Sequence, residues 1–450
     1  MWIDFCRKIL YIGWDVTLWR YIMMYEQPAN NHEFITEPER KLQIAGRCDV
    51  LVAGGGPAGF AAALSAARNG AKTVLLEKNQ CLGGIWTAGL MPWFIDFQNK
   101  TGIMQELCEA LKQVGGYTAR PNTFTAPPEE VRYMLEKLAL DSGVIIQYGT
   151  NVCNAITADR RIEYVISESK SGRQAWQARF FIDATGDGDL AAVSGCSFEF
   201  GNSEKQAQPA SLNALIGGVD PEKCREFFVS DANGKSSFLA VLQQAGITPS
   251  YTHPSLFHFG CGIVGLMSHH AYGVVPFDDR SLSQAIISGR AELHEQISLL
   301  KNVPGWENAV LLGTAANLGI REGRRVRGKA TVSVDKLNCG EYPEDTVCIP
   351  KFCIDIHAPD PEKCTSVLQD RPAVGKRGYG IPLGALLSFD LDNLLMAGRC
   401  ISGDFTMHAS YRVTGNAVPM GEAAGWTAAE AVKNNIELEN VKNIPCFSKN

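Results

Sequence analysis

Three glycines, Gly54, Gly56 and Gly59, have the spacing G-x-G-x-x-G inside the run DVLVAGGGPAGFAAALSAARNGAKTVLLEK at 49–78. In this pattern the first glycine permits a tight turn, the second lets a pyrophosphate approach the backbone, and the third lets a helix pack closely on a strand. Glu77 follows at the distance where a carboxylate accepts the hydroxyls of an adenosine ribose, which favours FAD or NAD over NADP. We therefore predict dinucleotide binding; the alternative is an ordinary glycine-rich turn between a strand and a helix.

The elements around the glycines support that prediction. Residues 49–53 form a short apolar run typical of a buried strand, 57–69 is an Ala-rich helix that ends at Gly70, and 73–76 is a second strand. The N-terminus of the helix presents free N–H groups and a partial positive charge, and both suit a phosphate.

Later motifs extend the cofactor prediction. Gly83 and Gly84 come a few residues after Glu77 and allow close backbone approach, which favours FAD because the longer cofactor runs back along the protein from that point. The stretch FFIDATGDGD at 180–189 is a buried strand that runs into a glycine turn. Its Ala-Thr-Gly triplet at 184–186 suits a backbone crossing near a bound dinucleotide.

The C-terminal part returns to α/β character. A buried strand at 393–397 ends at Gly398-Arg399, and an Ala- and Gly-rich helix is expected at 415–432. A helix that begins near Asn416 would aim its N-terminus at the pyrimidine ring of a flavin and stabilise a negative charge there.

Residues 200–380 are less regular and indicate an inserted substrate domain. The run at 260–265 repeats the spacing G-x-G-x-x-G, but no strand–helix–strand unit surrounds it and no ribose acid follows, so no second dinucleotide site is predicted. The basic cluster REGRRVR at 321–327 precedes a strand-like run at 330–334. The cluster is either a solvated basic face or a clamp for an anionic substrate, since guanidinium groups match carboxylates in a bidentate way.

Composition bounds the class of protein. The chain has 450 residues, of which 45% are hydrophobic and 20% charged, as in a soluble globular protein of about three domains. The formal net charge of −6 predicts no nucleic-acid partner. None of the fourteen cysteines stands in a C-x-x-C pair, which argues against a metal or iron–sulfur site and favours free thiols in a reducing, cytoplasmic location.

The segment 1–26 is apolar and aromatic but is interrupted by Asp15 and Arg20, so it is too short and too charged to span a bilayer. Three explanations stay open. It is an amphipathic docking segment, a packed N-terminal helix, or sequence upstream of a start at Met23 or Met24. No transmembrane segment is expected.

Taken together, these motifs resemble the FAD-dependent oxidoreductase family with the glutathione-reductase-type FAD domain, in the branch nearest the fumarate reductase and succinate dehydrogenase flavoproteins. The blocks that carry the resemblance are the run at 53–78, LGG at 82–84, DATGDGDLA at 183–191, REGRRVRG at 321–328, and NLLMAGRCISG with the later GEAAGWTAA. The resemblance implies an α/β fold: a Rossmann-like FAD-binding domain with a parallel central sheet, and an inserted α+β substrate or cap domain. The boundaries expected are an N-terminal extension at 1–45, a discontinuous FAD-binding domain at 46–200 and 375–435, the insert at 201–374, and a tail at 436–450.

The resemblance also implies which residues contact FAD. Those expected at the pyrophosphate are Gly54, Gly56, Pro57, Ala58 and Gly59; those at the adenosine side are Glu77, Val152, Ala184, Thr185 and Gly186; those toward the isoalloxazine are Asn416, Ala417 and Val418; and Lys78, Gly83, Gly84, Trp86, Thr87 and Asp187 complete the set. Gly398 and Arg399 stand where relatives carry a Gly-Asp or Gly-Glu pair that contacts the ribityl chain, so Arg399 departs from the pattern. No histidine lies between His32 and His253, which favours non-covalent FAD.

The function implied is hydride transfer between flavin N5 and a small organic substrate, either anionic or neutral, with a side chain that moves a proton. Candidates for catalysis are His408, Arg412 and Arg321, with His269 and His270 as further options. Two alternatives stay open. One is a monooxygenase or oxidase that uses O2, a class that usually keeps the Gly-Asp pair. The other is an FAD-binding protein whose flavin is structural or regulatory, or one that serves RNA modification. The electron partner and the oligomeric state are left open.

Overall fold

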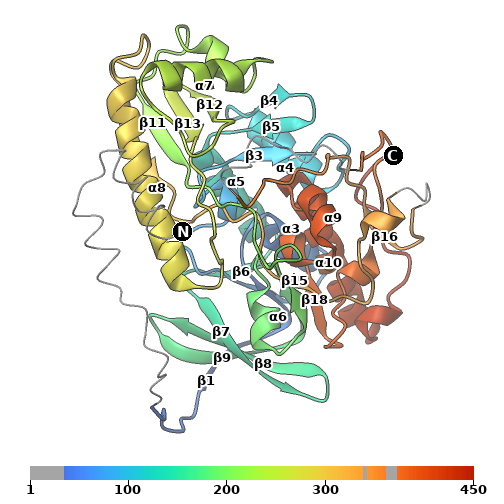
Figure 1. Ribbon diagram of the computed structural model, residues 1–450. Coiled ribbons are helices and arrows are strands. Elements are labelled where there is room, and N and C mark those ends of the chain that lie inside the picture. The colour runs from blue at the N-terminus through green and yellow to red at the C-terminus, as the bar shows by residue number, and fades with distance from the viewer. Residues whose placement is uncertain (1–34, 338–341, 361–371, 450) are drawn as a thin grey trace. The chain divides into compact units, whose positions relative to one another are not determined.

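The computed structural model describes residues 35–337, 342–360 and 372–449, and the chain divides into two units, 1–42 and 43–450 (Figure 1). The explanations offered for the segment 1–26 lie outside the described residues. All elements below belong to the second unit.

In the described part of the chain, the largest sheet has seven strands (Figure 1). Its path runs β6 (Ile145–Gln147), β2 (Thr73–Leu76), β1 (Gln43–Ala53), β9 (Gly172–Asp183), β8 (Arg161–Ser169) and β7 (Asn151–Ala158), and β18 (Leu394–Met396) also pairs with β9. The pairs of β1 with β2 and β9, of β2 with β6 and of β18 with β9 are parallel, whereas β7 and β8 form antiparallel pairs. The predicted α/β class with a mainly parallel central sheet is confirmed.

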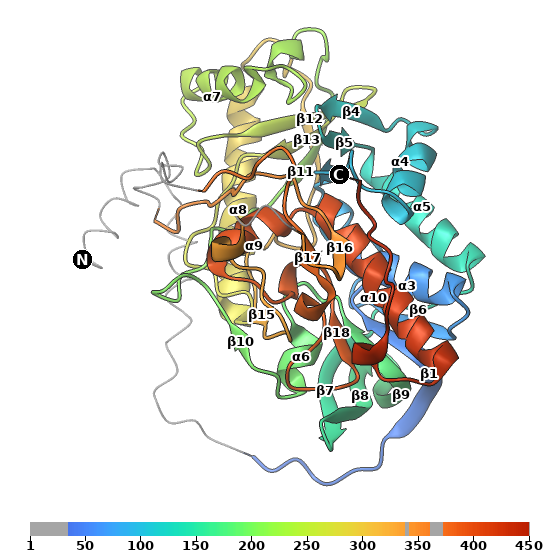
Figure 2. The ribbon, with the colours of Figure 1, turned by 90° about the vertical axis from the view of Figure 1, so that its right-hand side faces the viewer.

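Helices α3 (Pro57–Arg68) and α10 (Thr414–Asn434) lie side by side (Figure 2). Small residues allow this close approach. A Cβ added at Gly421 would stand 2.0 Å from the carbonyl oxygen of Ala58, and one at Gly425 would stand 2.1 Å from that of Ala62. Because α3 follows the glycine turn directly, the last long helix of the chain packs against the first part of the cofactor motif.

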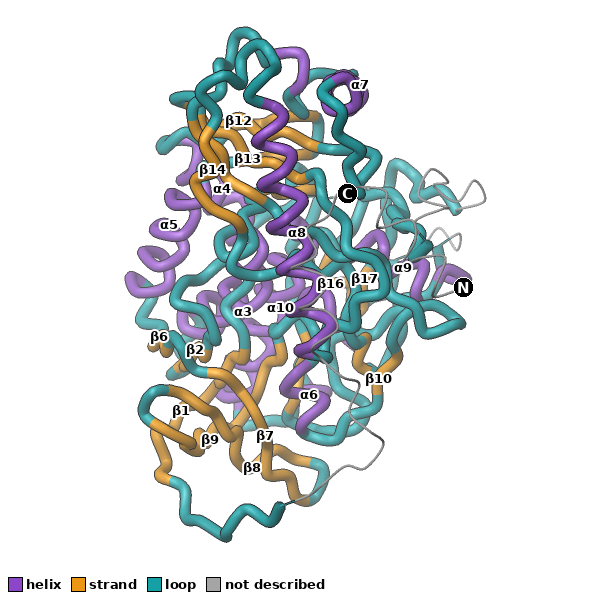
Figure 3. Tube along the Cα trace, turned by 60° about the vertical axis from the view of Figure 1, so that its left-hand side comes forward, coloured by secondary structure: helices purple, strands orange, loops and turns teal. Residues whose placement is uncertain are grey.

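The remaining elements form smaller sheets and their helices (Figure 3). A three-stranded sheet consists of β3 (Trp93–Ile95), β5 (Thr123–Thr125) and β4 (Tyr117–Arg120), and α4 (Ile103–Lys112) and α5 (Pro128–Asp141) are its neighbours in the chain. A four-stranded sheet consists of β12 (Ser255–Gly260), β13 (Ile263–Met267), β11 (Ala214–Gly217) and β14 (Val310–Thr314). The helices α7 (Gly234–Gln244) and α8 (Asp279–Leu300) belong to the same part of the chain. Short elements are α6 (Asp189–Val193), β10 (Phe198–Glu199), β15 (Arg325–Val326), β16 (Thr346–Cys348), β17 (Ile381–Pro382) and α9 (Phe405–Tyr411).

Two local expectations have clear outcomes. The run at 260–265 lies in the antiparallel β12–β13 hairpin with no helix after its glycines, which confirms that it is not a dinucleotide motif. The strand expected at 330–334 is wrong. Its backbone groups bond to different partners, Ala330 to Gly384 and Val332 to Ser402, so no continuous ladder forms there.

Buried side chains of the described residues form a main hydrophobic core, a second core and a smaller third cluster. The second core gathers residues between Ala210 and Leu318, whereas residues from Val326 to Ile381 belong to the main core. The boundaries expected at 201 and 374 stay predictions. On packing grounds we propose that the part of the insert with its own core is 210–318.

Among the described residues, no helix has the length and apolar character needed to cross a bilayer. The same part of the chain holds no group of three or more His, Cys, Asp or Glu residues placed to bind a metal ion.

Candidate active site

A cavity of about 630 Å³ is lined both by the glycine turn after β1 and by charged residues from distant parts of the chain. Its size is that of a site for a cofactor or drug-sized ligand. The predicted site residues that line it are Gly54, Gly56, Pro57, Ala58, Glu77, Lys78, Gly84, Val152, Ala184, Thr185, Gly186, Asp187, Arg321, Gly398, Arg399, Arg412 and Ala417. One continuous cavity therefore joins the cofactor motif to the Arg321 and Arg412 side chains.

The three glycines of the motif differ in what surrounds them. Gly54 has φ of +93°, and an added Cβ would stand 2.6 Å from the carbonyl oxygen of Ala184. A Cβ at Gly59 would stand 1.7 Å from the carbonyl oxygen of Gly54, which fixes the packing of α3 on the turn. At Gly56 an added Cβ would meet no protein atom within 4 Å, so this position opens into the cavity. That open cradle fits a pyrophosphate close to the backbone.

Glu77 is 4% exposed and lines the cavity in a fixed orientation. Its Oε2 accepts a hydrogen bond from Gly55 N at 2.5 Å, and its Oε1 accepts one from Asn79 N at 2.7 Å. Oε1 also accepts from Asn79 Nδ2 at 2.6 Å, so Oε2, with one protein donor, is the oxygen that retains acceptor capacity. This arrangement fits a ribose hydroxyl group that donates to Oε2.

Arg399 connects the turn after β9 to the inserted region. Its guanidinium pairs with Asp187 Oδ1 at 2.6 Å and donates to the carbonyl oxygens of Gly186, at 2.9 Å, and of Ile320. Arg399, which stands where relatives carry an acidic residue, thus forms an ion pair with Asp187. It also links the turn after β9 to Ile320, the residue before Arg321.

Seven predicted site residues do not line the cavity: Gly59, Gly83, Trp86, Thr87, His408, Asn416 and Val418. Trp86 is buried and stacks on Phe94 with ring centroids 4.1 Å apart. Thr87 Oγ1 donates to the carbonyl oxygen of Leu82, which shapes the loop after β2. Trp86 and Thr87 therefore stabilise the loop after β2 without lining the cavity themselves.

His408 is completely buried in α9 and packs edge-on against Tyr411. Burial lowers its pKa well below the usual value, so the ring stays neutral and is shielded from the cavity. The further options His269 and His270 also lie outside the lining. His269 Nδ1 accepts from Leu212 N at 3.1 Å, and His270 stacks on Tyr251.

Arg321 and Arg412 come together at the cavity. Arg321 donates to the carbonyl oxygen of Pro209 at 2.7 Å and to Ser211 Oγ at 2.8 Å. Arg412 donates to the carbonyl oxygen of Asp355 at 2.9 Å. Burial lowers the pKa of Arg412 to about 10, which still leaves it charged at neutral pH.

The sequence analysis missed Asp355 and His357, which also line the cavity. Asp355 Oδ2 lies 3.1 Å from His357 Nε2. Burial works against ionisation of Asp355, but the hydrogen bond from His357 and the charges of His357, Arg412 and Arg321 lower its pKa below the usual value. Burial and the charge of Arg321 lower the pKa of His357 to about 4. The i, i+2 spacing in the run CIDIH was the available signal, because alternate residues of an extended segment share a face.

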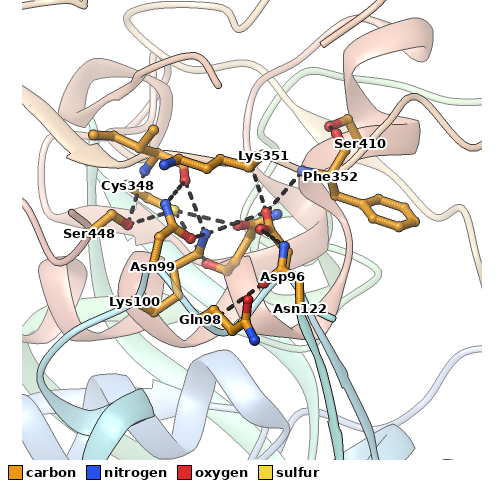
Figure 4. Close-up of polar contacts among 12 residues, drawn as sticks. Asp96, Gln98, Asn99, Lys100, Asn122, Cys348, Lys351, Phe352, Ser410 and Ser448 are labelled. Carbon is orange, nitrogen blue, oxygen red and sulfur yellow. Dashed lines mark hydrogen bonds and ion pairs between the residues drawn. The ribbon is translucent and has the colours of Figure 1, made fainter. Parts of the chain in front are cut away.

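A buried polar network holds the segment that carries Asp355 and His357 (Figure 4). Asp96 accepts from Lys351 N at 2.8 Å and from Phe352 N at 3.1 Å, and its carboxylate lies 3.4 Å from Lys100 Nζ. Both side chains of this ion pair are 0% exposed. The network therefore fixes the backbone a few residues before the Asp355–His357 pair.

Comparisons with known proteins agree with the cofactor half of the site. A family model described as FAD dependent oxidoreductase matches residues 49–449. The thiamine thiazole synthase of Methanococcus vannielii is 33% identical over 156 residues, which are 32% of this chain and 58% of that protein. The thiamine thiazole synthase of Pyrococcus horikoshii is 29% identical over 161 residues, 32% of this chain and 59% of that protein. The chain thus spans somewhat over half the length of these relatives.

Among solved structures, a geranylgeranyl bacteriochlorophyll reductase-like protein from Thermoplasma acidophilum is 16% identical, with 87% of this chain and 80% of that chain covered and a TM-score of 0.47.

Proposed function

The chain belongs to the FAD dependent oxidoreductase family, and from that premise we propose that it transfers a hydride between flavin N5 and a small anionic organic substrate. The family makes it an enzyme with FAD as cofactor. When bound, FAD supplies the two-electron chemistry. What the chain's own residues add is binding of the substrate and movement of a proton.

The observation that carries the proposal is that Arg321 and Arg412 line the same cavity as the glycine turn. Both guanidinium groups are fixed by neighbouring acceptors, so little side-chain entropy is lost when they bind a ligand. Two fixed cations in a partly buried site favour a carboxylate, which forms charge-assisted hydrogen bonds with guanidinium.

His357 is the residue we propose for proton transfer. A carboxylate only accepts hydrogen bonds, so the contact with Asp355 places the imidazole proton on Nε2 and leaves Nδ1 as an acceptor. With its pKa lowered to about 4, the ring is neutral at physiological pH. Nδ1 of His357 would take a proton from the substrate as the hydride leaves, or return one in the opposite direction.

The cofactor would be held by residues already placed around the cavity. Gly56 leaves room for the pyrophosphate, Glu77 presents a fixed carboxylate for the ribose, and the turn at 184–187 with Arg399 closes the site. We do not carry over the activity of the thiamine thiazole synthases, because the match to them covers only 32% of this chain.

The test is anaerobic reduction of the purified FAD-bound protein by a panel of small organic acids, followed by absorbance of the flavin. We expect at least one acid to bleach the flavin in wild type, and Arg321→Met and Arg412→Met to raise the half-saturating acid concentration by tenfold or more. Arg161→Met is the matched control, since that arginine is partly exposed and pairs with Glu437 away from the cavity.

The same preparation separates the alternatives. Reoxidation of the reduced flavin by organic acceptors supports a dehydrogenase or reductase. Rapid reoxidation by O2 with release of peroxide or a hydroxylated product would instead identify an oxidase or monooxygenase, and a flavin that no acid or acceptor changes would point to a structural role.

A further inference from the structure

Asn213 lines the cavity and has an unused hydrogen-bond acceptor. Its side chain is 1% exposed and belongs to the cavity lining. Nδ2 donates to the carbonyl oxygen of Gly89 at 2.8 Å, which fixes the orientation of the amide. Oδ1 is buried and has no hydrogen-bond partner among the described residues. A buried carbonyl oxygen without a partner is costly, so its retention in a cavity points to a ligand that donates to it.

The position of Asn213 in the chain places this acceptor next to the substrate cations. Ser211 and Asn213 both line the cavity, whereas Leu212 between them belongs to the second hydrophobic core. Alternate residues of an extended segment project from one face about 7 Å apart. Ser211 Oγ accepts from Arg321 at 2.8 Å, so the free acceptor and the guanidinium of Arg321 are presented by neighbouring positions of one segment.

We infer that the substrate is a small hydroxy acid, with its carboxylate on Arg321 and Arg412 and its hydroxyl group donating to Asn213 Oδ1. This inference rests on the proposed function and adds the substrate class. A hydroxyl group fits better than an ammonium group, because Arg321 is close enough to act electrostatically on both Arg412 and Lys235, and these three cations would repel a further one. Asn213 is then a specificity-determining residue, which separates a hydroxy acid from the same acid without the hydroxyl group.

The test measures binding to the anaerobic FAD-bound protein by calorimetry and by the shift of the flavin spectrum. The probes are matched pairs: glycolate with acetate, lactate with propionate, 2-hydroxyglutarate with glutarate, and mandelate with phenylacetate. We expect the hydroxy acid of at least one pair to bind about tenfold more tightly than its partner. Where the hydroxy acid reduces the flavin, its half-saturating concentration replaces the dissociation constant.

Two variants show which residue causes the preference for the hydroxy acid over its partner. Asn213→Leu, which keeps the branched shape but is larger and has no hydrogen-bonding group, should bring the hydroxy acid down to the affinity of its partner. Arg321→Met should weaken both members of a pair alike. Thermal melting and FAD content check that each variant is folded, and the wild-type pairs test the inference even if Asn213→Leu is unstable.

The outcomes separate the inference from the proposed function. If acids bind wild type but no pair shows a preference, the hydroxy-acid inference is wrong and the proposed function stands. If no acid binds, both are wrong. If Asn213→Leu releases FAD while the preference within pairs is unchanged, the acceptor faces the cofactor and the inference is overturned.

Discussion

Asp355 Oδ2 lies 3.1 Å from Nε2 of His357, and both side chains line the cavity that the glycine turn also lines. The pair comes from one extended segment, yet its environment is assembled from remote parts of the chain. Arg412 contacts Asp355, and Gln208 accepts from the backbone N–H of His357 at 3.0 Å. Because Asp355 contacts the His357 ring, the pKa of His357 reports on the electrostatics of the site and can be measured.

We predict that His357 titrates near pH 4 and that its neighbours move this value in opposite directions. Burial and the charge of Arg321 lower its pKa, whereas Asp355 raises it. Arg321→Met should therefore raise the pKa by roughly one unit, and Asp355→Asn should lower it. NMR of protein labelled at the histidine rings would follow the titration in the absence of substrate.

The resonance of His357 is assigned by its loss in His357→Gln. His253 provides an internal reference for Arg321→Met, because burial is also the main cause that lowers its pKa and Arg321 is not among its further neighbours. It is no reference for Asp355→Asn, since Asp355 raises the pKa of His253 as well. A titration of His357 near pH 6.5 that neither variant shifts would contradict the proposed electrostatics.

The glycine turn gives a prediction about FAD binding that is independent of the substrate. Gly56→Ala should leave the fold intact, because the new Cβ meets no protein atom within 4 Å, but should weaken FAD binding tenfold or more. Gly56→Val should weaken it further. Gly59→Ala is the contrasting variant, since its Cβ would stand 1.7 Å from the carbonyl oxygen of Gly54, and it should destabilise the protein itself.

The measurements are FAD content, FAD affinity of the apoprotein and thermal melting. Full occupancy by FAD in Gly56→Val would remove the assignment of the turn as the pyrophosphate site.

The cofactor half of the site was predictable from sequence because its chemistry depends on local spacing. Gly54, Gly56 and Glu77 stand within one strand–helix–strand unit, and each works through backbone geometry or position along a strand. The expected fold class followed from the family resemblance that this unit and the later motifs carry.

The substrate half was predictable only in part, because it depends on contacts between distant segments. Arg321 was expected from its residue type and Arg412 from the family resemblance. Asp355 instead acquires its role through Arg412 and through Asp96, which lies 259 positions earlier in the chain. His408 shows the opposite case: α9 lies between β18 and α10 in the chain, but the His408 side chain is buried and packs against Tyr411 rather than lining the cavity. Periodicity does not reveal which side of a short helix such as α9 faces a cavity.

The buried pair of Asp96 and Lys100 predicts a strong coupling in stability. Lys100→Met leaves the carboxylate of Asp96 without a countercharge in the core, and Asp96→Asn leaves the ammonium group of Lys100 without one. Each substitution should lower the free energy of unfolding by about 3–5 kcal/mol. The double variant should cost less than the sum of the two single variants, because neither charge remains and the amide oxygen of the new Asn side chain still accepts from a backbone N–H.

Denaturant unfolding of the four proteins measures this cycle. Lys137 and Asp141 form a matched control, an exposed pair with the same i, i+4 spacing for which the coupling should be close to zero. Simple additivity at Asp96 and Lys100 would show that the pair is not coupled.

Glu422 in α10 predicts how stability depends on pH. It is 8% exposed and accepts from Ile103 N at 2.9 Å, and burial raises its pKa to about 7. Since the unfolded carboxyl group titrates near pH 4.5, the folded state binds the proton more tightly, and the stabilising effect present below pH 4.5 is lost as the pH rises to 7.

Glu422→Gln cannot titrate and can keep the bond to Ile103. Its stability relative to wild type should rise by on the order of 2 kcal/mol between pH 4.5 and 7.5. Urea unfolding at a series of pH values measures this difference, with Glu437→Gln at an exposed position as control. A stability difference that is constant with pH would mean that folding does not raise the pKa of Glu422.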